Sequence, residues 1–125
     1  VYMSLINLKF TSCDIVIKLR STPTADAIKS ILPCKSIIKT WGEEIYFEIP
    51  IKKYLCLDNT AKDVINLGEI AYWAEGKCIA IGYGQTPISR DTEIRLAAKT
   101  NIWGDANLNV KKLKNIKDGD EVIIS

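Results

Sequence analysis

The feature that most constrains this fold is an alternation of apolar and polar residues in short segments separated by turns. Residues 2–10 and residues 14–20 both alternate with a period of two, and only the segment from Thr11 to Cys13 separates them. A period of two is typical of half-buried β-strands, and so short a connection predicts a hairpin. The side chains expected to face inward are Ser4, Ile6, Leu8, Phe10, Ile15, Ile17 and Leu19.

The same alternation returns after Pro33 and recurs in separate segments up to residue 124. The stretch WGEEIYFEIP places three apolar residues on one face of a strand and Glu44, Tyr46 and Glu48 on the other. Residues 51–67 lack the pattern and are expected to form a long surface connection. The remaining expected strands are residues 35–41, 43–49, 69–73, 78–83, 93–100, 101–104 and 121–124.

One segment has a helical period instead. Thr22 can cap its N-terminus, Pro23 suits the first helical position, and apolar residues then recur at helical spacing. The sequence therefore predicts a helix over residues 23–32, with Ile28 and Ile31 buried. Near the C-terminus, residues 107–113 are expected to form one or two helical turns.

The number of strands limits the architecture. About eight or nine short strands in so small a protein must roll into a barrel or pack as a sandwich to bury their apolar faces. The 125 residues are expected to form a single domain, residues 1–125. No apolar run approaches the roughly 18 residues that span a bilayer, and no secretory leader pattern is present, so we expect a cytoplasmic protein without a membrane partner.

Histidine is absent from the chain, which excludes a Ser-His-Asp or Cys-His catalytic device and the commonest transition-metal ligand. The cysteines Cys13, Cys34, Cys56 and Cys78 form no Cys-x-x-Cys pair, so no metal site is predicted. The favoured interpretation is four small buried hydrophobic residues, and one or two disulfides are the alternative. Nothing in the sequence predicts a cofactor.

Four segments, taken in order, resemble a known family. They are GEEIYFEIP, GEIAYWAEGKCIAIGYGQTPIS, NIWGDANL and KDGDEVIIS, and they are similar to an archaeal and bacterial family of cyclophilin-like barrels. That family shares a Gly-Glu/Asp-Ile-x-Tyr-Trp element and a Gly-x-Thr-Pro element, and the resemblance runs from about Ile15 to Ile124. It implies a closed antiparallel β-barrel with the helix of residues 23–32 over one open end. The family has no settled biochemical activity.

The wider cyclophilin group consists of prolyl isomerases, so the resemblance also implies an activity to be checked. The catalytic strand of those enzymes is similar to Phe-His-Arg-Ile-Ile-Pro, whereas residues 45–50 here contain no arginine, and Thr100 stands where they have a histidine. Rotation about an X-Pro bond has a barrier of about 20 kcal/mol, and lowering it needs a cation or strong donor near the proline nitrogen. Glu44 and Glu48 supply the wrong charge. A conventional isomerase is therefore disfavoured.

Two groups of polar residues are candidates for a ligand site. Glu44, Tyr46 and Glu48 form either an acidic, hydrogen-bonding wall or a solvated outer face of the barrel. Gln85 and Thr86 lie either on a loop at the barrel mouth, where pockets tend to form, or in a turn that only ends a strand. The resemblance places this loop near the isomerase groove, which favours the site.

Aromatic residues flank these candidates in the sequence. Tyr72 and Trp73 are expected to pack beside the ligand site. Trp41 and Trp103 complete the set, and residues of this kind fill a core more often than they stack on a ligand.

The strand of residues 78–83 has one nearly bare face, because Ala80, Gly82 and Gly84 alternate with bulky residues. Glycines inside a strand mark the close approach of a ligand or of another chain segment, or a bend. We expect a groove along this face, with the Gln-Thr pair at its lip and Tyr46 across from it. A barrel corner is the alternative.

The sequence thus predicts a cyclophilin-like barrel that binds a small molecule or an extended peptide without conventional isomerase chemistry. A weak or divergent prolyl isomerase is the alternative. A nucleic-acid-binding barrel that uses the basic run near the C-terminus is a third interpretation, but nucleic acid is not the expected partner, because such a run is more typical of a solvated face. That run consists of Lys111, Lys112, Lys114 and Lys117.

Overall fold

The computed structural model describes residues 4–125, except for the side chains of residues 107–109. Its strands are β1 (Leu5–Phe10), β2 (Asp14–Leu19), β3 (Cys34–Ile37), β4 (Lys39–Thr40), β5 (Glu44–Glu48), β6 (Lys62–Ile65), β7 (Glu69–Trp73), β8 (Cys78–Gly82), β9 (Ile94–Asp105) and β10 (Glu121–Ile124). Residues 2 and 3 of the first expected strand lie outside the described residues.

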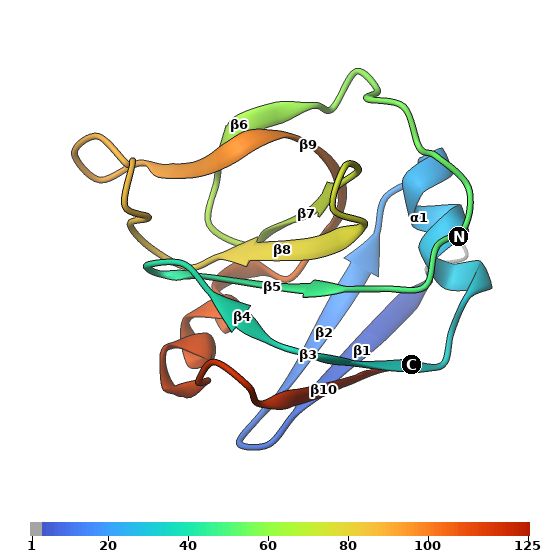
Figure 1. Ribbon diagram of the computed structural model, residues 1–125, viewed down its shortest axis with the longest axis horizontal. Helices are drawn as coiled ribbons and strands as arrows, with labels where there is room; N and C mark the ends of the chain where they lie inside the picture. Colours follow the sequence, from blue (N-terminus) through green and yellow to red (C-terminus); the bar gives the residue numbers. More distant parts are fainter. Residues whose placement is uncertain (1–3) are drawn as a thin grey trace.

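Nine of the strands in residues 4–125 form a nearly closed antiparallel barrel, as predicted (Figure 1). They follow one another in the order β3-β10-β1-β2-β9-β7-β8-β5-β4, and β6 pairs only with β9. The expected strand of residues 35–41 is divided at Ile38 into β3 and β4. Because β3 pairs with β10 and β4 pairs with β5, this divided segment connects the two ends of the strand order.

Two other elements differ from the sequence prediction. The segment of residues 51–67 is not only a loop, because β6 forms within it and pairs with β9. The two strands expected at residues 93–100 and 101–104 are one strand of 12 residues, β9. This strand pairs with β6 in its first part and with β7 and β2 in its last part. The expected boundary between two strands is therefore the point at which β9 changes its partner strand.

The helices agree with the expected positions but differ in detail. Helix α1 (Pro23–Ser30) begins after Thr22, whose side-chain oxygen accepts a hydrogen bond from the Ala25 N–H at 3.1 Å. Ile28 is fully buried as predicted, whereas Ile31 is only partly buried, because it is the C-cap residue. The C-terminal helical turns are a 3-10 helix, η1 (Asn107–Asn115).

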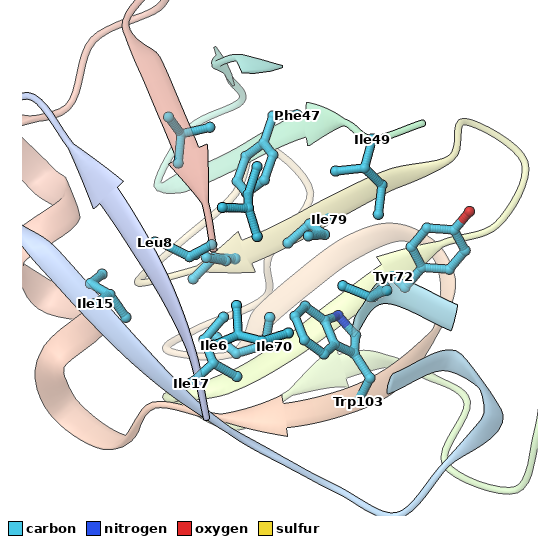
Figure 2. Close-up of a cluster of buried hydrophobic side chains, with 14 of the residues drawn as sticks. Ile6, Leu8, Ile15, Ile17, Phe47, Ile49, Ile70, Tyr72, Ile79 and Trp103 are labelled. Atoms are coloured by element: carbon cyan, nitrogen blue, oxygen red, sulfur yellow. The ribbon is translucent and has the colours of Figure 1, made fainter. Parts of the chain in front are cut away.

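The buried apolar side chains form two separate clusters. The larger cluster fills the barrel and includes Phe47, Tyr72 and Trp103 (Figure 2). The smaller cluster consists of Ile65, Ala71, Ala80, Ile94, Leu96 and Ile102. It exists because β6 and the first part of β9 arch over the outward face of β7 and β8 (Figure 1). This second layer positions the candidate site.

The four cysteines carry free thiols. The expectation of four buried residues is correct only for Cys78, since Cys56 is exposed and both Cys13 and Cys34 are partly buried. Burial raises the pKa of the Cys78 thiol to about 11. Among the described residues, no three His, Cys, Asp or Glu side chains are grouped so that they could hold a metal ion. No helix in this part of the chain has the length and hydropathy needed to cross a membrane.

Candidate functional site

A pocket of about 320 Å³ lies between the outward face of β5 and β8 and the arch of β9. We call it the aromatic pocket, because three of its side chains are Trp41, Tyr46 and Trp73. The full set of lining residues is Trp41, Glu44, Tyr46, Trp73, Ala80, Leu96, Ala97, Ala98 and Thr100.

The arch of β9 leaves room for the pocket because its pairing with β6 is irregular. Lys62 is paired with Thr100 and Val64 with Arg95, so Asp63 alone stands opposite the four residues from Leu96 to Lys99. Such a bulge bends a strand and re-aims its side chains. As a result, the adjacent residues 97 and 98 both line the pocket, although neighbours in a regular strand face opposite ways.

Glu44 is the acidic residue of the aromatic pocket. Strand alternation turns it away from the barrel core, yet only 6% of its surface is exposed, because the second layer covers it. Its Oε1 atom is buried and has no hydrogen-bond partner among the described residues. Burial without such a partner raises the pKa of the Glu44 carboxyl to about 7. The group therefore exchanges its proton near neutral pH.

Trp73 also lines the pocket and carries a second buried polar atom without a hydrogen-bond partner among the described residues. Its ring lies so close to the backbone of Gly76 that a Cβ atom at that position would overlap the ring, so the glycine is needed for this placement. The Trp73 Nε1 atom is buried and, like Glu44 Oε1, has no hydrogen-bond partner in residues 4–125. The hydroxyl of Thr100, in contrast, donates to the Lys62 carbonyl oxygen at 3.1 Å.

The structure brings together three of the residues predicted for the site, Glu44, Tyr46 and Trp73. Glu48 is exposed and lies in an adjoining groove of about 810 Å³, which Tyr46 and Trp73 also line. Tyr72 is not beside the pocket: its side chain is 1% exposed and belongs to the main core (Figure 2). The reason is strand alternation, which turns Tyr72 and Trp73 to opposite faces of β7.

Gln85 and Thr86 line neither the aromatic pocket nor the groove. Thr86 is buried, and its hydroxyl donates to the carbonyl oxygen of Arg95. The exposed Gln85 side chain donates to the carbonyl oxygen of Asp91. Both side chains therefore stabilise the loop between β8 and β9 in which they lie.

Of the three positions on the bare strand face, only Ala80 lines the aromatic pocket. It pairs with Tyr46 across the strands, as expected. The expected groove is wrong at Gly82, where Ile94 and Ile65 of the second layer cover the glycine. Gly84 is approached by the carboxylate of Glu43. The side chains that approach these two glycines closely therefore belong to the protein itself.

The sequence prediction missed the β9 side of the pocket, Leu96, Ala97 and Ala98. Two consecutive alanines in the middle of a strand were the available signal, since they leave the strand without bulk on either face. Trp41, which the sequence places in the core, is instead partly exposed and lines the pocket.

Comparison with known proteins agrees with this fold. The sequence pattern of the cyclophilin-like family matches residues 4–125. The chain belongs to the cyclophilin-like family. This cyclophilin-like protein is also similar to the solution structure of a hypothetical protein from Archaeoglobus fulgidus, with 35% sequence identity and a TM-score of 0.81. The match covers 98% of this chain and 94% of that one. No curated protein matches this cyclophilin-like chain.

Proposed function

We propose that this cyclophilin-like protein binds a small molecule in the aromatic pocket. The observation that carries the proposal is the pair of buried polar atoms without partners, Glu44 Oε1 and Trp73 Nε1, in residues that line one pocket. An unsatisfied buried polar group costs about 1–3 kcal/mol. A ligand with one donor and one acceptor would recover this cost, whereas a merely structural pocket has no reason to retain it.

The remaining walls support the same proposal. Small-molecule sites are concave and mostly apolar, with a few polar groups that fix orientation, and their volumes begin at about 300 Å³. The aromatic pocket has this composition, because Trp41, Tyr46, Trp73 and Leu96 line it together with the carboxyl-bearing Glu44. Ala80, Ala97 and Ala98 keep the interior free.

A matched pair of substitutions on β9 tests this function. Ala98 lines the pocket and is partly exposed, so Ala98→Phe should fill the pocket without entering the core. Lys99 is the next residue, is exposed and does not line the pocket, so Lys99→Phe is the control. We expect fragments that bind the wild-type protein, detected by ligand-observed NMR, to lose at least about tenfold in affinity for the first variant only. Equal affinity for both variants would place binding elsewhere.

An extended peptide is a second candidate ligand, and the groove beside the aromatic pocket favours it. β5 pairs with β4 only at Ile45 and Tyr46, so its edge from Phe47 onward borders the groove. Across the groove, the Ser36 hydroxyl donates to the Glu48 carbonyl oxygen at 2.6 Å. A peptide that paired with Glu48 as an added strand would therefore have to displace the Ser36 hydroxyl from this carbonyl oxygen. Amide shifts at Phe47 and Glu48, without shifts at Ala98, would mark a peptide.

We expect negligible prolyl isomerase activity. The pocket is lined by a carboxyl group, and no lysine or arginine lines it among the described residues, so the cation that weakens amide resonance is missing. The hydroxyl of Thr100, at the position of the isomerase histidine, is already used in a hydrogen bond to Lys62. A protease-coupled assay on a proline peptide should give the uncatalysed rate. Acceleration comparable to that of an ordinary cyclophilin would contradict this expectation.

A further inference from the structure

We propose that the ligand of the aromatic pocket is a small organic ammonium ion that also carries an oxygen acceptor, as an amino alcohol does. This inference rests on the proposed small-molecule function and specifies its ligand class. It follows from three properties of the pocket: one carboxyl group without a cationic partner, three aromatic rings, and one indole N–H without an acceptor.

The charge of the pocket favours a cation. Glu44 carries the only carboxyl group among the described lining residues, and none of these residues is basic. The nearby basic residues of the second layer have other partners, since Arg95 pairs with Glu93 and Asp63, and Lys62 pairs with Glu69. A buried carboxylate is stable when a positive charge is next to it, and the described residues do not place one beside Glu44.

The aromatic residues favour a cation for a second, independent reason. Trp41 precedes β5, Tyr46 lies on β5 and Trp73 lies at the end of β7, so the three rings reach the pocket from different segments. Aromatic faces attract cations, tryptophan most strongly, and the attraction increases when the cation is removed from water. A pocket that combines three such rings with one carboxyl group is therefore better suited to an ammonium ion than to a neutral group of the same size.

The free oxygen of Glu44 indicates which kind of ammonium ion fits. Oε1 needs a hydrogen-bond donor, and a primary or secondary ammonium ion has N–H bonds, whereas a quaternary one has none. A charge-assisted bond of this type is about twice as strong as a neutral one. The terminal torsion of glutamate is broad, so rotation of the carboxyl group can present either oxygen to the ligand.

The indole of Trp73 defines the other end of the ligand. Its Nε1–H is a donor only, so its missing partner is an acceptor. A hydroxyl, ether or carbonyl oxygen satisfies it. A carboxylate would accept the same bond but would bring a second negative charge into the pocket that already holds Glu44, so an anionic ligand is disfavoured.

The titration of Glu44 supports this ligand class. Burial raises the pKa of its carboxyl to about 7, and a bound ammonium ion should lower that pKa and release the proton. The titratable side chains on the same face of β5 and β8 are Tyr46, Glu48 and Cys78, and Lys39 on β4 is paired with Tyr46. The residues of β7 and β9 that line the pocket are uncharged. Binding should therefore be roughly tenfold tighter at about pH 8 than at about pH 6.

Two compounds that differ in one group test the inference. The probes are 2-amino-1-phenylethanol and 1-phenylethane-1,2-diol, in which an ammonium group is replaced by a hydroxyl group and the acceptor oxygen is kept. Calorimetric titration of the wild-type protein at about pH 8 should show the amino alcohol binding at least about tenfold more tightly. In Glu44→Gln this preference should fall at least about threefold, with the aromatic rings retaining the rest, whereas in Glu48→Gln, an exposed carboxylate on the same strand, it should keep its wild-type size.

Each other result has a distinct meaning. If both compounds bind equally and both are displaced by Ala98→Phe, the pocket binds small molecules but the cation inference is wrong. If neither compound binds at about 10 mM, the inference is wrong, and the fragment measurement on Ala98→Phe and Lys99→Phe decides the proposed function separately. If the preference survives in Glu44→Gln and disappears in Glu48→Gln, the cation binds in the groove and the inference is also wrong.

Discussion

Replacing Glu44 with glutamine is expected to stabilise this protein at about pH 8, in contrast to most substitutions of buried residues. The carboxyl of the unfolded chain titrates near pH 4.5, whereas burial raises the pKa of the folded group to about 7. Between these two values the folded state holds a proton that the unfolded state has released. The contribution of Glu44 to stability therefore falls as the pH rises through this window and stays low above it. A pKa difference of this size corresponds to on the order of 3 kcal/mol.

The measurement is chemical denaturation of wild type and Glu44→Gln between about pH 4 and pH 8. The two proteins should have similar stability at the acid end, since both then carry a neutral group of similar shape, and should diverge in favour of the variant as the pH rises. Glu48→Gln, which changes an exposed carboxylate, should follow the wild-type curve. A loss of stability in Glu44→Gln at about pH 8 would mean that the folded protein already pairs this carboxylate with a cation.

The barrel could be predicted from the sequence because the sequence patterns that specify its strands and helix are local. Alternation along Ile45, Phe47 and Ile49 identifies the inward face of β5 without knowledge of any partner strand, and all three residues are buried. The helix was equally predictable from Thr22 and the apolar spacing that follows it. Each of these signals depends on neighbours within a few residues of the chain.

The candidate site was only partly predictable because its burial is not local. The outward face of β5 was assigned correctly to Glu44 and Tyr46, but whether that face meets water depends on β6, which pairs with residues about 30 to 40 positions away. The four residues of β6 are too few to be recognised in the irregular stretch around them, and the bulge opposite Asp63 hides the alternation of β9. Without that second layer, Glu44 would be an ordinary surface carboxylate.

Because β6 and β9 cover the barrel at Gly82, a substitution of this glycine is expected to cause a second large change in stability. A Cβ atom there would overlap Cγ2 of Ile94 and would lie 3.4 Å from Cδ1 of Ile65. The Ile94 methyl is attached at the branch next to the backbone, so it cannot move aside without moving β9. Gly82→Val should therefore overpack the second layer and cost about 1–3 kcal/mol. Thermal denaturation should show a melting temperature lower by roughly 5–15 °C.

Gly84→Val is the matched control for this substitution. Gly84 lies two residues further along the same chain segment, and the three atoms nearest to its Cβ would all belong to the carboxylate end of Glu43. This side chain is exposed and can rotate away at the loss of one hydrogen bond from the Gln85 N–H. The melting temperature of this variant should stay within a few degrees of wild type, the added β-propensity of valine offsetting small losses. If Gly82→Val melts as the wild-type protein does, Ile94 is not packed on β8. The second layer would then not be what buries Glu44, and the stabilisation expected from Glu44→Gln would be lost with it.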